Sequence, residues 1–174
     1  MSNEQKVAIV TGASQGIGAG IVEAYRKEGY VVVANSRNIQ PSSDAGVIAV
    51  PGSIGERGVA EQVVKTAVER FGRVDTLINN AGIFIGKPFT DYTVEDFNNV
   101  INVNVAGFFH VTQFAIAEML KRGHGHIVQI TTALVDQPIA DVPTGLATLT
   151  KGGLDAVTRG LAIEYAKNGI RVNA

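Results

Sequence analysis

Short apolar runs, mostly of β-branched residues, recur along the chain, and longer segments with helical spacing separate them. Continuous apolar runs of this kind are typical of strands buried on both faces of a parallel sheet. The intervening segments can supply the crossover connections that parallel strands require. We therefore expect strands at residues 7–11, 31–35, 47–50, 76–79, 127–131 and 170–173.

Helical periodicity is clearest at residues 59–71, where five apolar residues fall on one face. Thr93 has the pattern of a helix N-cap, because Asp96 follows three residues later. Further helices are expected at residues 17–28, 103–121 and 145–167. Alternating strands and helices predict an α/β fold, with a doubly wound parallel sheet inside three αβα layers.

We expect one domain over residues 1–174, since neither an internal repeat nor a linker interrupts the pattern. The sixth strand has barely begun at Ala174, whereas parallel strands normally continue into another crossover. The expectation is therefore a domain truncated within strand six and lacking its last strand or strands.

The composition excludes several classes of function. Fifteen basic and sixteen acidic residues give a net charge of −1, so neither nucleic acid nor an anionic membrane is an expected partner. The absence of cysteine excludes disulfides, thiolate catalysis and zinc–cysteine sites. The polar N-terminus lacks a signal-peptide core, and no apolar run approaches the roughly 18 residues of a membrane helix. We expect a soluble, cytoplasmic protein.

A glycine-rich loop, TGASQGIG at residues 11–18, follows the first predicted strand and opens the first predicted helix. Its small residues allow a sharp turn and a close approach of the backbone to a pyrophosphate, which then lies at the positive helix N-terminus. Glycine also marks ordinary turns, but this position between a strand and a helix favours a dinucleotide-binding loop of Rossmann type.

The chain resembles the short-chain dehydrogenase/reductase family in four stretches that follow one another in the family's order. The loop at residues 11–18 matches the family pattern TGxxxGxG, and NNAG at residues 79–82 matches the motif after its fourth strand. VNVAGF at residues 103–108 resembles its helix-borne active-site asparagine, and residues 161–174 resemble the segment leading to its sixth strand. This resemblance implies a small-molecule carbonyl or alcohol substrate and a homodimer or homotetramer.

The resemblance implies a nicotinamide dinucleotide cofactor, and the end of the second strand favours NADP(H), with NAD(H) as the alternative. Ser36 stands where an acidic residue would bind the ribose hydroxyls of NAD, and Arg37 can pair with a 2′-phosphate. Gln15 replaces the basic residue of many NADP-preferring relatives, and Ser53 replaces a usual aspartate at the adenine. The other cofactor-binding positions implied by the resemblance are Gly12, Ser14, Gly16, Ile17, Gly18, Asn80, Ala81, Gly82 and Lys151.

The family's catalytic asparagine, serine and lysine correspond to Asn104, Thr132 and Lys151, with Thr132 expected to end strand five. Its tyrosine, which exchanges a proton with the substrate oxygen, corresponds to Ala147, four residues before Lys151. A positioned acid–base group contributes about 10²–10⁴-fold to a rate, so this replacement bears directly on catalysis. Asp136, Asp141 or a Lys151 of lowered pKa are the alternative proton donors.

Two functions remain open at this point. One is an NADP(H)-dependent oxidoreductase with an unusual proton donor, and the other is a catalytically inactive NADP-binding sensor or oligomer partner. A metal site is not expected, since His124 and His126 have no third ligand at useful spacing. His110 is expected to be partly buried and structural.

Overall fold

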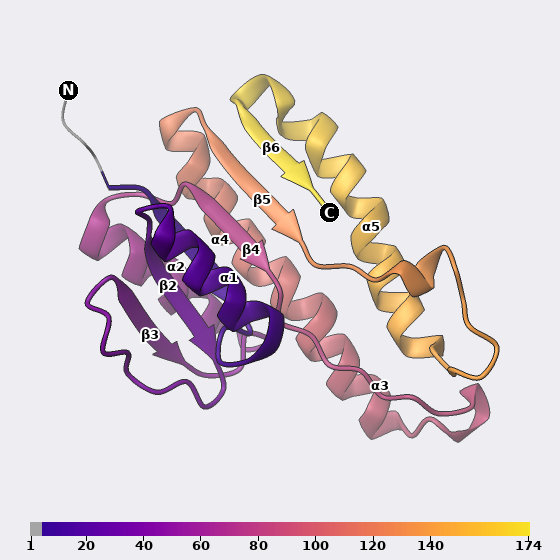
Figure 1. Cartoon of the computed structure of the whole chain (residues 1–174). Helices are drawn as coiled ribbons and strands as arrows, with labels where there is room; N and C mark the ends of the chain where they lie inside the picture. The colour runs from indigo at the N-terminus through magenta and orange to yellow at the C-terminus, as the bar shows by residue number, and fades with distance from the viewer. Residues whose placement is uncertain (1–4) are drawn as a thin grey trace.

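The computed structural model describes residues 5–174 and contains one six-stranded sheet flanked by helices (Figure 1). The strand order is β3-β2-β1-β4-β5-β6, and each neighbouring pair is parallel. This arrangement confirms the α/β, doubly wound parallel fold expected from the sequence. The strands are β1 Val7–Thr11, β2 Val31–Ser36, β3 Val47–Pro51, β4 Thr76–Asn79, β5 Gly125–Gln129 and β6 Ile170–Asn173.

The central strands are buried on both faces, as their continuous apolar sequences predict. Every residue of β1 and β4 is buried, and β2 is buried up to its last residue. Val7 lies opposite Val31 in the β1–β2 pair, and Ala8 lies opposite Thr76 in the β1–β4 pair. The carboxyl ends of β1, β2 and β4 therefore reach the same edge of the sheet.

Helices cover the two faces unequally within residues 5–174. The helix α1, Gly16–Lys27, packs over one face through a small cluster around Ala8, Val10 and Val32. On the other face, helices and strands share a larger core that includes Val63, Val111 and Leu161. The helices of that face are α2 Arg57–Phe71, α4 Gly107–Arg122 and α5 Gly145–Tyr165.

The two helices predicted here, one capped by Thr93 and one at residues 103–121, are joined without a break by a π-helical turn. The helix α3, Val94–Ile101, starts at the expected Thr93 cap, where Thr93 and Asp96 form a reciprocal capping box. The π turn, Asn102–Ala106, follows directly and leads into α4. An extra residue per turn of this kind frequently marks a functional site.

Strand β5 lies two residues earlier than predicted, so Thr132 does not end it. Gly125 pairs with Ile170 of β6, which extends the start of the strand. At the other end, Ile130 N donates to Asn79 O at 3.0 Å, and β4 stops there. Residues after Ile130 have no further strand residue of β4 to pair with, so the chain leaves the sheet.

One helical stretch, Val94–Arg122, is long and apolar enough, by length and composition alone, to cross a membrane. The sequence-based expectation that no segment reaches this length and hydropathy is therefore wrong. Its mean hydropathy reaches 1.4 in an 18-residue window, of which 39% is buried. Val111, Ala115 and Met119 of this stretch are buried in the core beneath the sheet, and this packing accounts for its apolar sequence. The polar segment at residues 1–4, which weighed against a signal peptide, lies outside the described residues.

Candidate functional site

The glycine loop folds tightly because three of its glycines occupy positions that other residues would disturb. Gly12 and Gly16 have φ values of +65° and +54°, a left-handed conformation that favours glycine. A Cβ on Gly18 would lie 2.1 Å from the carbonyl oxygen of Gly12, so α1 approaches the end of β1 very closely. The loop therefore leaves its backbone exposed to a ligand at the N-terminus of α1.

The NNAG motif after β4 is fixed against this loop by hydrogen bonds. Asn80 Nδ2 donates to the carbonyl oxygens of Thr11 and Gly12 at 2.9 and 3.0 Å. The Thr11 hydroxyl accepts hydrogen bonds from the backbone N–H groups of Asn80 and Ala81. The two motifs therefore form one rigid unit at the carboxyl edge of the sheet.

A cleft of about 620 Å³ lies at this edge. It is lined by Gly12, Ser14, Gln15, Gly16, Ile17, Gly18, Asn35, Ser36, Arg37, Asn38, Gly52, Ser53, Ile54, Asn80, Ala81, Gly82 and Val103. The sequence-predicted cofactor residues all line it except Lys151. Its position outside the carboxyl ends of β1, β2 and β4 is where α/β sheets of this topology bind ligands.

The cleft residues fit a dinucleotide. The glycine loop forms a cradle that packs tightly, because a Cβ on Gly12 or Gly18 would collide with the NNAG motif or with Gly12 O. The N-terminus of α1 at this glycine cradle presents backbone donors to an anion. The Ser36 hydroxyl oxygen is buried without a hydrogen-bond partner among the described residues, so it can bond a ribose or phosphate oxygen. Arg37 beside it is exposed and adds a cation at the cleft wall.

Five lining residues were not predicted: Asn35, Asn38, Gly52, Ile54 and Val103. The first four follow or end strands β2 and β3, so the rule that ligands bind at carboxyl ends could have found them. Asn35 Nδ2 donates to Val50 O and Gly52 O at 3.0 and 3.1 Å, which ties the ends of those two strands together. Val103 lies in the π turn and has no local sequence signal.

Asn104 lies in the π turn and is almost completely buried. Its Oδ1 accepts a hydrogen bond from Ile83 N at 2.8 Å, and its Nδ2 donates to Ile83 O at 3.1 Å. The same Nδ2 also donates to Thr150 Oγ1 at 3.2 Å. Asn104 thus joins the π turn, the segment after the NNAG motif and α5.

Lys151 lies beside Asn104, and the two side chains meet at Gly82. A Cβ on Gly82 would lie 3.3 Å from Lys151 Nζ and 3.4 Å from Asn104 Oδ1. Lys151 Nζ donates to Ile130 O at 2.5 Å. Burial lowers the pKa of Lys151 from its ordinary value, because a desolvated ammonium is disfavoured.

Thr132 lies two residues beyond Ile130, in the loop after β5. Its Oγ1 accepts a hydrogen bond from Leu134 N at 3.3 Å and so caps a short 3₁₀ helix, Ala133–Val135. The threonine hydroxyl proton remains available to a substrate oxygen. No hydrogen bond between Thr132 and Asn104 or Lys151 is present in the described structure.

Ala147 occupies the first turns of α5, one turn before Lys151, and is 7% exposed. Its methyl group can neither donate nor accept a proton. Asp136 and Asp141, considered as alternative donors, are both exposed in the loop between β5 and α5. Lys151, in contrast, is half-buried beside Gly82.

The histidines do not form a metal site. Across residues 5–174 no group of three histidine, cysteine, aspartate or glutamate side chains could hold a metal ion. His126 pairs with Asn173 across β5 and β6 at 3.1 Å, and His124 lies in the turn before β5. His110 is half-buried on α4, and its ring packs edge-on to Phe109.

Large apolar side chains remain exposed on two neighbouring helices. Phe109 of α4 is 54% exposed, and Leu149 and Ile163 of α5 are 57% and 81% exposed. These side chains lie outside the core beneath the sheet.

Comparison with known proteins identifies the same family throughout. The family described as short chain dehydrogenase matches residues 6–174. Oxidoreductase UcpA of Salmonella typhimurium is 35% identical over 177 residues, covering 97% of this chain and 67% of that protein. An uncharacterized oxidoreductase of Methylorubrum extorquens is 38% identical over 182 residues, covering 98% and 71% of the two chains.

Solved structures give the same result. A 3-ketoacyl-(acyl-carrier-protein) reductase from Brucella melitensis, complexed with NADH, is similar with a TM-score of 0.91 and 30% identity, covering 97% of this chain and 74% of that one. A gluconate 5-dehydrogenase from Burkholderia cenocepacia, in complex with NADP and tartrate, is similar with a TM-score of 0.86 and 26% identity. That alignment covers 97% of this chain and 69% of the dehydrogenase.

Proposed function

Because this chain belongs to the short-chain dehydrogenase family of oxidoreductases, we propose that it binds NADP(H) and acts on a small carbonyl or alcohol. The observation that carries the proposal is the cleft at the carboxyl edge of the sheet. It combines a glycine cradle, the hydroxyl of Ser36 and the cation of Arg37 at one end, with Gly82 leading to Asn104 and Lys151 at the other.

The preference for NADP(H) rests on the charge at the end of β2. Ser36 offers a hydroxyl in place of a carboxylate, so no negative side chain at that position repels a 2′-phosphate. Arg37 can form charge-assisted hydrogen bonds to such a phosphate, which contribute about 1.5–3 kcal/mol. We therefore expect a preference of roughly ten- to a hundredfold over NAD(H).

A bound nicotinamide dinucleotide supplies or accepts the hydride, and the chain must orient the substrate and manage its proton. Lys151, held by Ile130 O, places a cation beside Gly82, and Thr132 offers a hydroxyl proton to the substrate oxygen. Asn104 holds the π turn against Ile83 and α5. Ala147 cannot supply the proton, and Lys151, whose ammonium is made more acidic by burial, is the candidate donor.

Ala147 also favours a second function, an NADP-binding protein without turnover that acts as a redox sensor or oligomer partner. Such a protein would keep the glycine cradle, Ser36 and Arg37 and lose only the proton relay. The exposed apolar residues Phe109, Leu149 and Ile163 provide a surface on α4 and α5 for pairing with a second copy, as a homodimer or homotetramer.

The first experiment measures the affinities of NADPH and NADH by calorimetry at low and high salt. NADPH should bind at least several-fold more tightly, and the difference should shrink as salt screens the charge pairing. Arg37→Ala should remove most of the difference, whereas Lys167→Ala, which removes an exposed cation after α5, should not. Equal affinities of the unmodified protein at low salt would contradict the cofactor assignment.

The second experiment follows oxidation of the reduced cofactor with a panel of ketones and aldehydes. Turnover that depends on Lys151 supports the oxidoreductase. Tight NADPH binding without turnover of any substrate supports the inactive sensor.

A further inference from the structure

The connection between β2 and β3 crosses one face of the sheet without a helix. It comprises residues 37–46, between the end of β2 at Ser36 and the start of β3 at Val47. Parallel strands are normally joined by a dozen or more residues, usually through a helix that packs on the sheet. Two residues of this short crossover, Arg37 and Asn38, line the cleft. Something other than a packed helix must therefore hold the crossover in place.

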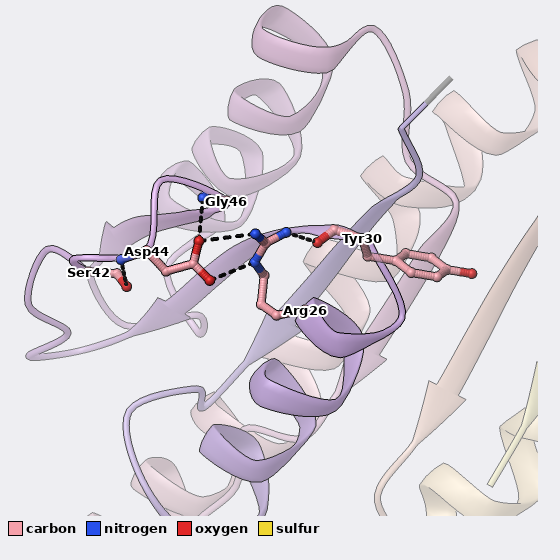
Figure 2. A network of polar contacts seen from close by, with 5 residues as sticks. All are labelled: Arg26, Tyr30, Ser42, Asp44 and Gly46. Atoms are coloured by element: carbon pink, nitrogen blue, oxygen red, sulfur yellow. Dashed lines mark hydrogen bonds and ion pairs between the residues drawn. The ribbon is translucent and has the colours of Figure 1, made fainter. Parts of the chain in front are cut away.

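An ion pair with α1 supplies that attachment (Figure 2). Arg26, near the end of α1, donates from Nε to Asp44 Oδ2 at 2.8 Å and from its second terminal nitrogen to Asp44 Oδ1 at 3.0 Å. This two-bond geometry fixes direction as well as distance, unlike a single contact between flexible charges. The guanidinium also donates to the backbone oxygen of Tyr30, so Arg26 is itself held at the start of β2.

Asp44 in turn orders the crossover around it. Its Oδ1 accepts a hydrogen bond from Gly46 N at 2.8 Å, and its own N–H donates to the Ser42 hydroxyl at 3.1 Å. A Cβ on Gly46 would lie 2.0 Å from Cζ of Arg26, so the guanidinium lies directly against the backbone of the crossover. The close approach of α1 to this loop depends on both the ion pair and the glycine.

Besides the ion pair, the crossover is attached to β2 by a hydrogen bond from Val32 N to Gly46 O at 2.8 Å. A cavity of about 670 Å³ lies between α1 and the crossover, and Arg26 and Asp44 both line it. This cavity meets the cofactor cleft at Ser14 and Asn38, which line both. Ile39 is the crossover side chain that packs against the smaller core. Movement of the crossover would therefore be transmitted directly to the wall of the cleft.

We propose that Arg26 and Asp44 are positioning residues for the cofactor, which hold the crossover so that Arg37 and Asn38 meet the 2′-phosphate of NADP(H). The inference rests on the proposed preference for NADP(H). Neither residue of the pair touches the phosphate, and both act through the placement of the crossover. The pair replaces, in this short connection, the packing that a crossover helix would give.

The test is the substitution Asp44→Asn, with NADPH and NADH affinities measured by calorimetry. Asparagine keeps the shape and can still accept from Gly46 N, but it loses the charge that binds Arg26. Removing a negative charge near the cleft would, by Coulomb's law alone, strengthen binding of the more anionic NADPH. Positioning predicts the opposite sign, a several-fold weaker binding of NADPH with NADH unchanged. The matched control is Asp155→Asn, which breaks an exposed ion pair with Arg159 on α5 and should change neither affinity.

A double substitution gives a second, independent readout. If the pair acts through Arg37, Asp44→Asn should weaken NADPH binding no further in a protein that already carries Arg37→Ala. Unchanged or tighter NADPH binding by Asp44→Asn overturns the inference. An equal loss of affinity for NADPH and for NADH overturns it too. Failure of the proposed cofactor preference is recognised separately, because Arg37→Ala alone would then leave NADPH binding unaltered.

Discussion

Thr11 accepts two hydrogen bonds from Asn80, one at its side chain and one at its backbone. The backbone N–H of Asn80 donates to Thr11 Oγ1 at 3.1 Å, and Asn80 Nδ2 donates to the Thr11 carbonyl oxygen at 2.9 Å. These bonds join two segments that are 69 residues apart in the sequence. The glycine loop at the end of β1 consequently keeps its shape only while the end of β4 is in place.

Thr11→Val should therefore lower both stability and dinucleotide affinity. Valine has nearly the same shape but cannot accept the hydrogen bonds from Asn80 N and Ala81 N. Leaving such donors unsatisfied costs about 1–3 kcal/mol each, so urea unfolding should show a loss of at least that order. Thr11→Ser retains the hydroxyl and should lie close to the unmodified protein. A valine variant as stable as the serine variant would show that water satisfies both donors.

Two glycines on α1 should respond oppositely to alanine. At Gly18 a Cβ would lie 2.1 Å from Gly12 O, so Gly18→Ala should push α1 away from the loop and abolish measurable dinucleotide binding. At Gly20 nothing lies within 4 Å of the added Cβ, so Gly20→Ala should stabilise the helix by roughly 0.5–1 kcal/mol and leave binding intact. Calorimetry and thermal unfolding of both variants measure the contrast. Equal binding by the two would mean that the close approach of α1 is not needed.

The Asp75 carboxylate, which accepts a hydrogen bond from the start of β1, should make the free energy of unfolding depend on pH in the acid range. Burial raises the pKa of Asp75, but the hydrogen bonds from Arg73 and from Val7 N outweigh it and hold the pKa below its ordinary value. A carboxyl whose pKa is lower in the folded state stabilises the fold above its unfolded pKa of about 3.9. That contribution is lost as the pH falls through the folded pKa, so unfolding should become easier on acidification below about pH 4.

Asp75→Asn isolates this contribution. Hydrogen bonds to charged groups contribute about 1.5–3 kcal/mol, so the substitution should cost that much near neutral pH. It should cost less as the pH falls below about 4, because the stabilisation that depends on the lowered pKa of the folded carboxyl is then progressively lost. Asp155→Asn on α5 removes an exposed pair and should cost no more than about 0.5 kcal/mol at either pH. A cost for Asp75→Asn that is independent of pH would contradict the assignment.

The Ala147 position makes a direct catalytic prediction. Ala147→Tyr returns a phenolic hydroxyl to the turn before Lys151 and should raise carbonyl reduction, by at most about 10²–10⁴-fold. Ala147→Phe is the matched control, because its ring fills the same space but has no hydroxyl proton to donate. Steady-state rates with NADPH distinguish the two variants. Brisk, Lys151-dependent turnover by the unmodified protein, unimproved by tyrosine, would mean that another donor acts, and Asp136 and Asp141 would be substituted next.

Most of the sheet was predictable because its strands are buried on both faces. The apolar run of β1 favours a buried strand, and the predicted bounds of both β1 and β4 agree with the structure. The capping box was equally predictable, since its two partners, Thr93 and Asp96, lie three residues apart. The position of the cleft was predictable from the glycine loop, because the loop lies at the carboxyl end of β1, where sheets of this topology bind ligands.

Features set by distant contacts were not predictable. The π turn at Asn102–Ala106 coincides with two hydrogen bonds between Asn104 and Ile83, 21 residues earlier, one donated by each residue. The early start of β5 depends on pairing with Ile170, far along the chain. The Arg26–Asp44 pair joins residues 18 apart in the sequence, and the crossover at residues 37–46 that contains Asp44 forms neither helix nor strand. Each of these depends on which segments meet in three dimensions.

The strand order has a consequence for the nascent chain on the ribosome. Because β1 lies between β2 and β4, its second edge stays unpaired after β2 has emerged and until residues 76–79 follow. At about 5–20 residues per second this interval of some forty residues lasts roughly 2–8 seconds. An unpaired apolar strand edge is a site for aggregation during that time. Asp75 emerges immediately before β4 and bonds Val7 through both its backbone and its carboxylate, so the contact that sets the register arrives just ahead of the strand that closes the edge.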